Sequence, residues 1–277
     1  MTTVLVIGAS GKVGSQVVKE LDANHEGIHV RRQAVILNLD DPNTLPSALQ
    51  GIGRLFMVTG YTADMLYQSK MLIDAAAAAG VEFVVHLGVY SSGRDHIPHF
   101  SWHDMIETYI KASGMAWTNL HPNVILDSLL VTEPSTIGKG SFDVMWGEAA
   151  LGWVSAADIG TLAATVLREG PEKHAGADYG LSPEILTGPQ AAEIITQATG
   201  TKIECNVYNS EALEAYVATI SDAGTRLYLN SAVQTMRLGE SGQMRYQATK
   251  RDDFEIVIGR PATTLYDWAR QNLVSNV

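Results

Sequence analysis

Two kinds of segment alternate along the first half of the chain. Short apolar runs rich in Val, Ile, Leu and Phe predict buried strands, and longer stretches with apolar residues three or four positions apart predict amphipathic helices. The predicted strands are 4–7, 28–32, 34–39, 55–59, 83–87 and 116–120. The predicted helices between them are 13–22, 41–49, 64–79 and 101–113. Because strands and helices alternate, the pattern predicts an α/β fold with a doubly wound parallel sheet.

The predicted strands 28–32 and 34–39 are difficult to reconcile, because only Gln33 separates them. Parallel neighbours need a crossover of about a dozen residues. Either one run is not a strand, or the pairing is irregular, or a flexible loop is absent from this sequence. We favour the last, which predicts a Cα–Cα distance near residues 32–34 above the roughly 3.8 Å of a peptide link.

After residue 130 the regular alternation ends. Residues 134–152 are predicted to be mostly loop, and 179–181 a short strand. Helices are predicted from about 156 to 168 and over 188–199, 210–219, 222–237 and 263–273. This pattern predicts a smaller, α-rich lobe that lies as a lid over the carboxyl edge of the sheet.

Several helix ends carry recognisable signals. Ser101 is expected to cap the 101–113 helix, with Asp104 at the capping-box position and Gly114 at its end. Ser155 or Asp158 is expected to cap the first helix of the second half.

A glycine-rich turn joins the first predicted strand to the first helix. Gly8 permits a tight turn, Gly11 lets a pyrophosphate approach the backbone, and Gly14 lets the helix pack closely on its strand. The free N–H groups at the helix start then face a phosphate; the alternative is a plain glycine turn. The residues expected to hold the phosphates are Gly8, Ser10, Gly11, Lys12, Val13 and Gly14.

This turn suggests a domain organisation for the chain. We expect 1–130 to form a Rossmann-like nucleotide-binding domain, with 153–170 returning to it. Residues 131–277 would then form most of the substrate-binding lid.

Composition narrows the possible partners. The 277 residues are 46% hydrophobic, enough for a substantial core, and carry a formal charge of −11 without a basic stripe. We therefore expect no nucleic-acid partner, and the apolar runs are too short for a membrane span. The single Cys205 and the lack of a leader-like segment favour a cytoplasmic protein. A monomer or homodimer is expected.

The motifs together resemble the NmrA-like family, an atypical branch of the short-chain dehydrogenase/reductases. The resemblance covers nearly the whole chain and is carried by the glycine turn, 103–107, 113–118, 121–123, 153–160, 179–182 and 259–261. It implies a nicotinamide cofactor. The family contains quinone reductases, triphenylmethane dye reductases, isoflavone-type reductases and redox sensors that catalyse nothing.

From this resemblance we expect a reductase that transfers hydride from NAD(P)H to a quinone-like or conjugated aromatic molecule. The alternatives are a non-catalytic nucleotide sensor and an atypical tailoring oxygenase on the same scaffold. Arg31 and Arg32 follow the second predicted strand, where they would pair with the 2′-phosphate of NADP. NADP is therefore the expected cofactor and NAD remains possible; the arginines could also be solvated surface residues.

The usual catalytic pair of this superfamily is missing. No Tyr-x-x-x-Lys stands at the start of the 101–113 helix, and Tyr246 with Lys250 lies outside that context. His103 occupies the lysine position, and Glu107 shares its helix face and could orient the imidazole. His103 is the first catalytic candidate, although it could be a packed helix residue instead.

Tyr90 is the second catalytic candidate, as a proton donor; packing is the alternative. His96, His99 and His103 could suggest a metal, but Pro98 interrupts their spacing and no fourth ligand is evident, so no metal is expected. The remaining cofactor contacts are expected from Asn38, Thr59, Gly60, Leu87, Gly88, His103, Pro122 and Asn123. The expected substrate contacts are Tyr61, Phe100 and Trp146.

Overall fold

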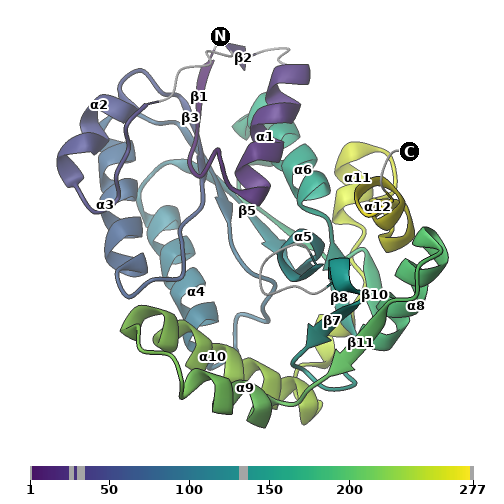
Figure 1. Cartoon of the computed structure of the whole chain (residues 1–277). Helices are drawn as coiled ribbons and strands as arrows, with labels where there is room; N and C mark the ends of the chain where they lie inside the picture. The colour runs from purple at the N-terminus through teal and green to yellow at the C-terminus, as the bar shows by residue number, and fades with distance from the viewer. Residues whose placement is uncertain (1, 25–27, 30–34, 131–136, 275–277) are drawn as a thin grey trace.

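The computed structural model describes residues 2–24, 28–29, 35–130 and 137–274 (Figure 1). A six-stranded parallel sheet with the order β2-β1-β3-β4-β5-β9 forms its centre. Its strands are β1 (Thr2–Val6), β2 (Ile28–His29), β3 (Arg54–Met57), β4 (Phe83–Leu87), β5 (Ala116–Pro122) and β9 (Ala177–Leu181). Because β2 and β3 lie on opposite sides of β1, a topological switch point falls at the carboxyl end of β1.

Helices cover both faces of this sheet, which confirms the doubly wound prediction (Figure 1). Alternate strand residues point to opposite faces, so Phe56 and Val85 pack with one helix layer, and Leu55 and Val84 pack with the other. The first layer contains α1 (Lys12–Ala23) and α6 (Ala156–Glu169). The second layer contains α2 (Leu45–Leu49), α3 (Met65–Ala78) and α4 (Pro98–Ala112).

The second half of the chain has its own core, built around Phe142, Trp153 and Trp268. Its sheets are β6 (Val124–Ile125) with β8 (Leu151–Val154) and β10 (Glu184–Leu186), and β7 (Ser141–Val144) with β11 (Glu204–Val207). Its longer helices are α8 (Gly188–Thr199), α9 (Ser210–Val217), α10 (Ala223–Glu240), α11 (Asp253–Ile258) and α12 (Leu265–Asn272). The short helical segments of the two halves together are η1 (Pro42–Thr44), α5 (Leu126–Leu130), η2 (Ile137–Lys139), α7 (Pro171–His174) and η3 (Arg245–Ala248).

Helices α9 and α10 lie across the end of the molecule toward which the parallel strands point (Figure 1). Within the described ranges, no helix combines the length and the apolar character that crossing a bilayer would require.

Two sequence predictions about strands are wrong. Residues 35–39 form no strand; Leu37 and Leu39 pack against the α2–α3 core instead, because Asn38 closes a turn with Thr44. The expected loop over 134–152 contains β7, which pairs in parallel with the distant β11. The expected chain gap near 32–34 lies outside the described residues.

The predicted start of α4 is also wrong. The helix begins at Pro98 with Ile97 as its cap residue, and the backbone N–H of Ser101 already donates to the carbonyl of Ile97 (2.9 Å). Proline suits the first helical position because its fixed φ matches the helix and its missing N–H costs nothing there. By contrast, the predicted Ser155 cap of α6 is confirmed, since its hydroxyl accepts from the N–H of Asp158 (3.0 Å).

Candidate active site

The glycine turn between β1 and α1 is tightly folded. Gly8 has a φ of +67°, and its carbonyl accepts the N–H of Gly11 (2.8 Å). A Cβ on Gly14 would lie 2.1 Å from the same carbonyl oxygen, so only glycine allows this close approach. No side chain caps the start of α1 among the described residues, which leaves its first N–H groups open to a ligand. Ser10 and Lys12 are exposed beside it.

The carboxyl ends of three neighbouring strands continue this edge. Residues 59–61 follow β3, residues 88–90 follow β4, and β5 ends at Pro122. The N–H of Gly88 donates to Leu120 (2.8 Å) and that of Tyr90 to Pro122 (3.0 Å), so the segment after β4 stays paired with β5. Most of the predicted cofactor contacts therefore lie along one edge of the sheet.

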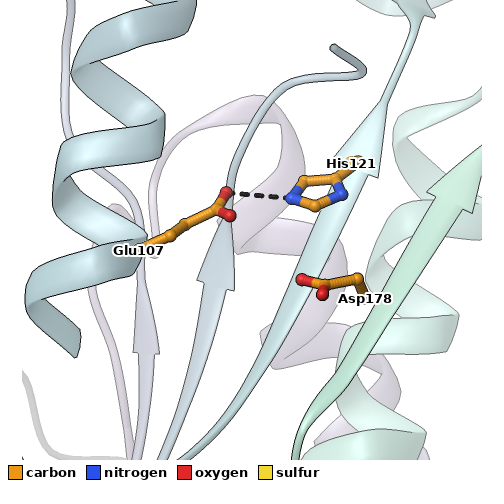
Figure 2. A group of neighbouring side chains, drawn as sticks. All are labelled: Glu107, His121 and Asp178. Carbon is orange, nitrogen blue, oxygen red and sulfur yellow. Dashed lines mark hydrogen bonds and ion pairs between the residues drawn. The ribbon is translucent and has the colours of Figure 1, made fainter. Parts of the chain in front are cut away.

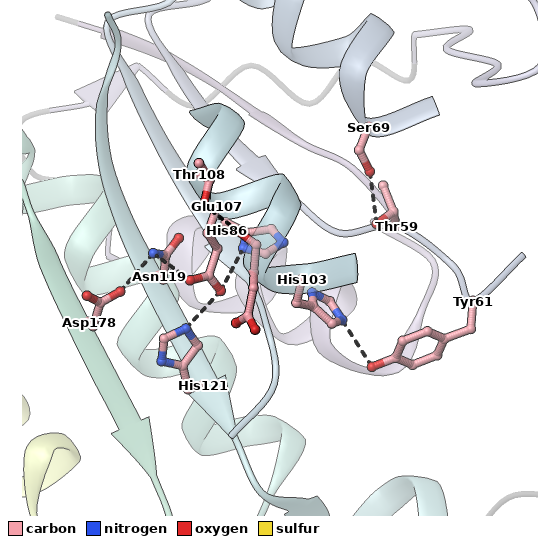
Figure 3. A network of polar contacts seen from close by, with 11 residues as sticks. Thr59, Tyr61, Ser69, His86, His103, Glu107, Thr108, Asn119, His121 and Asp178 are labelled. Atoms are coloured by element: carbon pink, nitrogen blue, oxygen red, sulfur yellow. Dashed lines mark hydrogen bonds and ion pairs between the residues drawn. The ribbon is translucent and has the colours of Figure 1, made fainter. Parts of the chain in front are cut away.

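His103 lies buried beneath this edge, on α4 (Figure 3). Its Nε2 is 3.1 Å from the hydroxyl of Tyr61, while its Nδ1 has no hydrogen-bond partner among the described residues. Burial, reinforced by the nearby His86, lowers the pKa of His103 to about 3. Burial also keeps the pKa of the Tyr61 hydroxyl well above its usual range. Both groups are thus neutral near pH 7.

Helix α10 covers Tyr61. The rings of Tyr61 and Tyr228 stack with their centroids 4.3 Å apart. One turn further along α10, the Ser231 hydroxyl accepts the N–H of His99 (3.0 Å) and lies 2.7 Å from its ring Nδ1. Through these contacts α10 packs against α4 and against the segment that follows β3.

Glu107 does not orient His103 as expected. Its carboxylate instead accepts hydrogen bonds from His121 Nε2 (2.9 Å) and Asn119 Nδ2 (3.3 Å), and lies 3.6 Å from the Nδ1 of His86 (Figure 3). Burial favours the neutral acid, but the hydrogen bond from His121 and the nearby ring of His86 outweigh it and hold the pKa of Glu107 below its usual range. A negative carboxylate therefore lies between α4 and the sheet.

Sequence reasoning missed the polar row that surrounds Glu107. His86, Asn119 and Asp178 are register partners on β4, β5 and β9, and Asn119 donates to Asp178 (2.8 Å). Ligand-capable atoms of Glu107, His121 and Asp178 lie within 4.8 Å of one another (Figure 2). The i, i+2 spacing of Asn119 and His121 places both on one strand face, a signal that the sequence contained.

Of the residues predicted to contact the adenosine end of the cofactor, the structure describes Asn38 but not the two arginines. Asn38 uses its side chain to accept the N–H of Asp40 (3.0 Å), and its backbone N–H donates to Thr44 (3.0 Å). It therefore stabilises a turn. Arg31 and Arg32 lie outside the described residues.

The three predicted substrate contacts belong to three separate apolar clusters. Tyr61 packs under α10, and Phe100 lies against the ring of His99 with centroids 4.6 Å apart. Trp146 is only 7% exposed and packs edge-on against Trp153 in the core of the second half. Tyr61 and Phe100 both lie against the ring of His99, whereas Trp146 belongs to the core of the second half.

Two of the three histidines considered as a metal site contact other side chains. His99 contacts Ser231 and His103 contacts Tyr61, whereas His96 is exposed on the preceding loop.

The only Tyr-x-x-x-Lys segment does not form a catalytic pair. The Tyr246 hydroxyl donates to Asp95 (2.6 Å), and Lys250 lies 3.2 Å from Asp252. Tyr90 is half-buried with its ring 6.0 Å from that of Tyr246, and burial raises the pKa of its hydroxyl.

A glycine turn at the switch point of a doubly wound parallel sheet defines a dinucleotide-binding protein of the Rossmann class. The model of the NmrA-like family matches residues 33–267. The chain belongs to the NmrA-like family.

Three known proteins are similar to this chain over nearly its whole length. The NAD(P)H azoreductase of Xenophilus azovorans is 29% identical over 96% of each chain. The structure of the NADPH-dependent quinone oxidoreductase of Escherichia coli in complex with NADPH superposes with a TM-score of 0.78 at 22% identity, covering 99% of this chain and 100% of that one. The triphenylmethane reductase of Citrobacter sp. complexed with NADP(H) gives a TM-score of 0.75 at 21% identity, covering 98% and 99%.

Proposed function

We propose that this protein is an NADPH-dependent reductase that transfers a hydride to a quinone-like or other conjugated aromatic acceptor. The observation that carries the proposal is the glycine turn, where a side chain on Gly14 would collide with the carbonyl of Gly8. Such a turn at an uncapped helix start suits a diphosphate. The similarity to the NAD(P)H azoreductase over 96% of each chain supports the reductase class and the nicotinamide cofactor expected from the sequence.

Each part of the edge would have its own task. Residues 8–14 would hold the diphosphate, and the residues at the ends of β3, β4 and β5 would line the rest of the cofactor. When bound, NADPH supplies the hydride. Among the described residues the buried Nδ1 of His103 has no partner, so this is the ring atom that we propose for a hydrogen bond with the bound ligands. The second half of the chain would form the lid over this edge.

The proton chemistry of the site favours acceptors that take a hydride readily. His103 is neutral near pH 7, so it supplies no imidazolium acid. Tyr90 is the proton donor that we propose, because it follows β4 at the same edge of the sheet, where its N–H pairs with the carbonyl of Pro122 (3.0 Å). A quinone needs little acid assistance, and holding it against the hydride donor would supply most of the rate.

The test is NADPH consumption, followed by its absorbance, with a panel of quinones and azo compounds. We expect turnover with NADPH in preference to NADH. Gly14→Ala should weaken NADPH binding more than tenfold, whereas Gly239→Ala, where a Cβ meets no atom within 4 Å, should not. Tight NADPH binding without turnover of any acceptor would contradict the proposal and favour a sensor. Oxygen uptake that depends on a phenolic substrate would favour the oxygenase alternative.

A further inference from the structure

A cavity of about 410 Å³ lies between the segment that follows β4 and the C-terminal part of α10. This volume falls within the roughly 300–1,000 Å³ typical of small-molecule sites. Arg94 and His96 line it from the β4 side, and Leu238 and Met244 from the other. The same segment begins with Gly88 and Tyr90, so the cavity is close in sequence to the proposed active edge.

The charged side chains that line this cavity differ in whether they have a partner. Arg237 is paired with Glu214. Asp95 accepts a hydrogen bond from the hydroxyl of Tyr246 (2.6 Å). In the part of the chain that the structure describes, the guanidinium of Arg94 forms neither a hydrogen bond nor an ion pair. Arg94 is thus the cation that remains available to a ligand, on a chain whose formal charge is −11.

Leu238 and Met244 form an apolar part of the wall, and Gln234 and Gln243 also line the cavity. Met244 is 5% exposed and packs with Ile97 and Phe100, and Leu238 lies against this cluster. The apolar contacts of Leu238 and Met244 beside one available guanidinium suit a flat aromatic ring that carries an acidic group. Arginine binds planar oxyanions with two parallel hydrogen bonds and also stacks on aromatic faces.

We propose that this cavity binds an aromatic carboxylate or sulfonate, and that Arg94 selects acceptors carrying such an acidic group. The inference rests on the proposed reductase function for its catalytic consequence. The binding of an aromatic anion by the cavity is a separate property that does not require turnover.

The kinetic test compares 1,4-naphthoquinone with 1,4-naphthoquinone-2-sulfonate as acceptors at fixed NADPH. Arg94→Gln should raise the KM for the sulfonate about tenfold and leave the KM for the neutral quinone and both kcat values within twofold. The matched control is Arg226→Gln, because Arg226 is an exposed arginine of α10 that lies outside the cavity lining. Equal KM values for the sulfonate in the wild-type protein and Arg94→Gln would overturn the proposal.

The binding test uses naphthalene-2-sulfonate, which cannot be reduced, in calorimetric titrations of the full chain. We expect a Kd that rises about tenfold in Arg94→Gln, rises with added KCl and is unchanged in Arg226→Gln. If no quinone is reduced but this binding pattern is found, the proposed function fails and the anion site stands. If the neutral quinone is reduced but the sulfonate gives no Arg94-dependent binding, the anion site fails and the proposed function stands.

Discussion

The two buried histidines of α4 should make the protein sensitive to mild acid. Burial lowers the pKa of His99 to about 4, and burial together with His86 lowers that of His103 to about 3. In the unfolded chain a histidine has a pKa of about 6.5. Below that pH the unfolded chain therefore binds protons that the folded chain does not, and the free energy of unfolding falls as the pH falls toward the folded pKa values.

The size of this effect follows from the two shifts. Each histidine costs up to about 1.4 kcal/mol per pH unit, so lowering the pH from 6.5 to 4.5 should remove about 2 kcal/mol for each and about 4 kcal/mol for both. The whole stability of a protein is typically about 5–15 kcal/mol. His103→Gln removes one of the two groups, so its loss over the same interval should be about 2 kcal/mol smaller than that of the wild-type protein.

The assay is urea unfolding at pH 6.5 and 4.5, with the free energy of unfolding extrapolated to water at each pH. Other titrating groups contribute equally to the wild-type protein and the variant, so the difference between the two losses isolates His103. His96→Gln is the control, because this histidine is exposed and its removal should leave the loss unchanged. Equal losses in His103→Gln and the wild-type protein would refute the assignment of His103 as a buried neutral group.

Three further outcomes are expected. Asp158→Ala should lower the free energy of unfolding by about 2–3 kcal/mol in urea titrations, because the buried carboxylate accepts both the N–H (2.8 Å) and the hydroxyl of Thr263; Asp158→Asn should restore part of it. Thr118→Val should cost about 1–2 kcal/mol and lower the Tm, since its buried hydroxyl donates to the carbonyl of His174 (2.6 Å). Between pH 6 and 8, the pH profile of kcat should have the same shape in the wild-type protein and in His103→Gln, because the imidazole of His103 is neutral throughout this range.

Local patterns determined much of this protein. The glycine turn, the alternating strands and helices and the Ser155 cap are all formed by residues close together in sequence, so the hydrophobic period and the turn residues were enough to predict them. The predicted strand over 34–39 failed because apolar residues can also pack from a turn. β7 was missed because its partner, β11, is distant in the chain.

The chemistry around α4 depended on how distant segments pack. His103 and Glu107 share a helix face in the sequence, yet Glu107 pairs with His121 and His103 with Tyr61. The packing of α4 against β5 sets the first pairing, and the position of Tyr61 after β3 sets the second. Periodicity reports which residues are buried, but partners are chosen only when helix and sheet pack together, because a hydrogen bond needs two atoms about 3 Å apart.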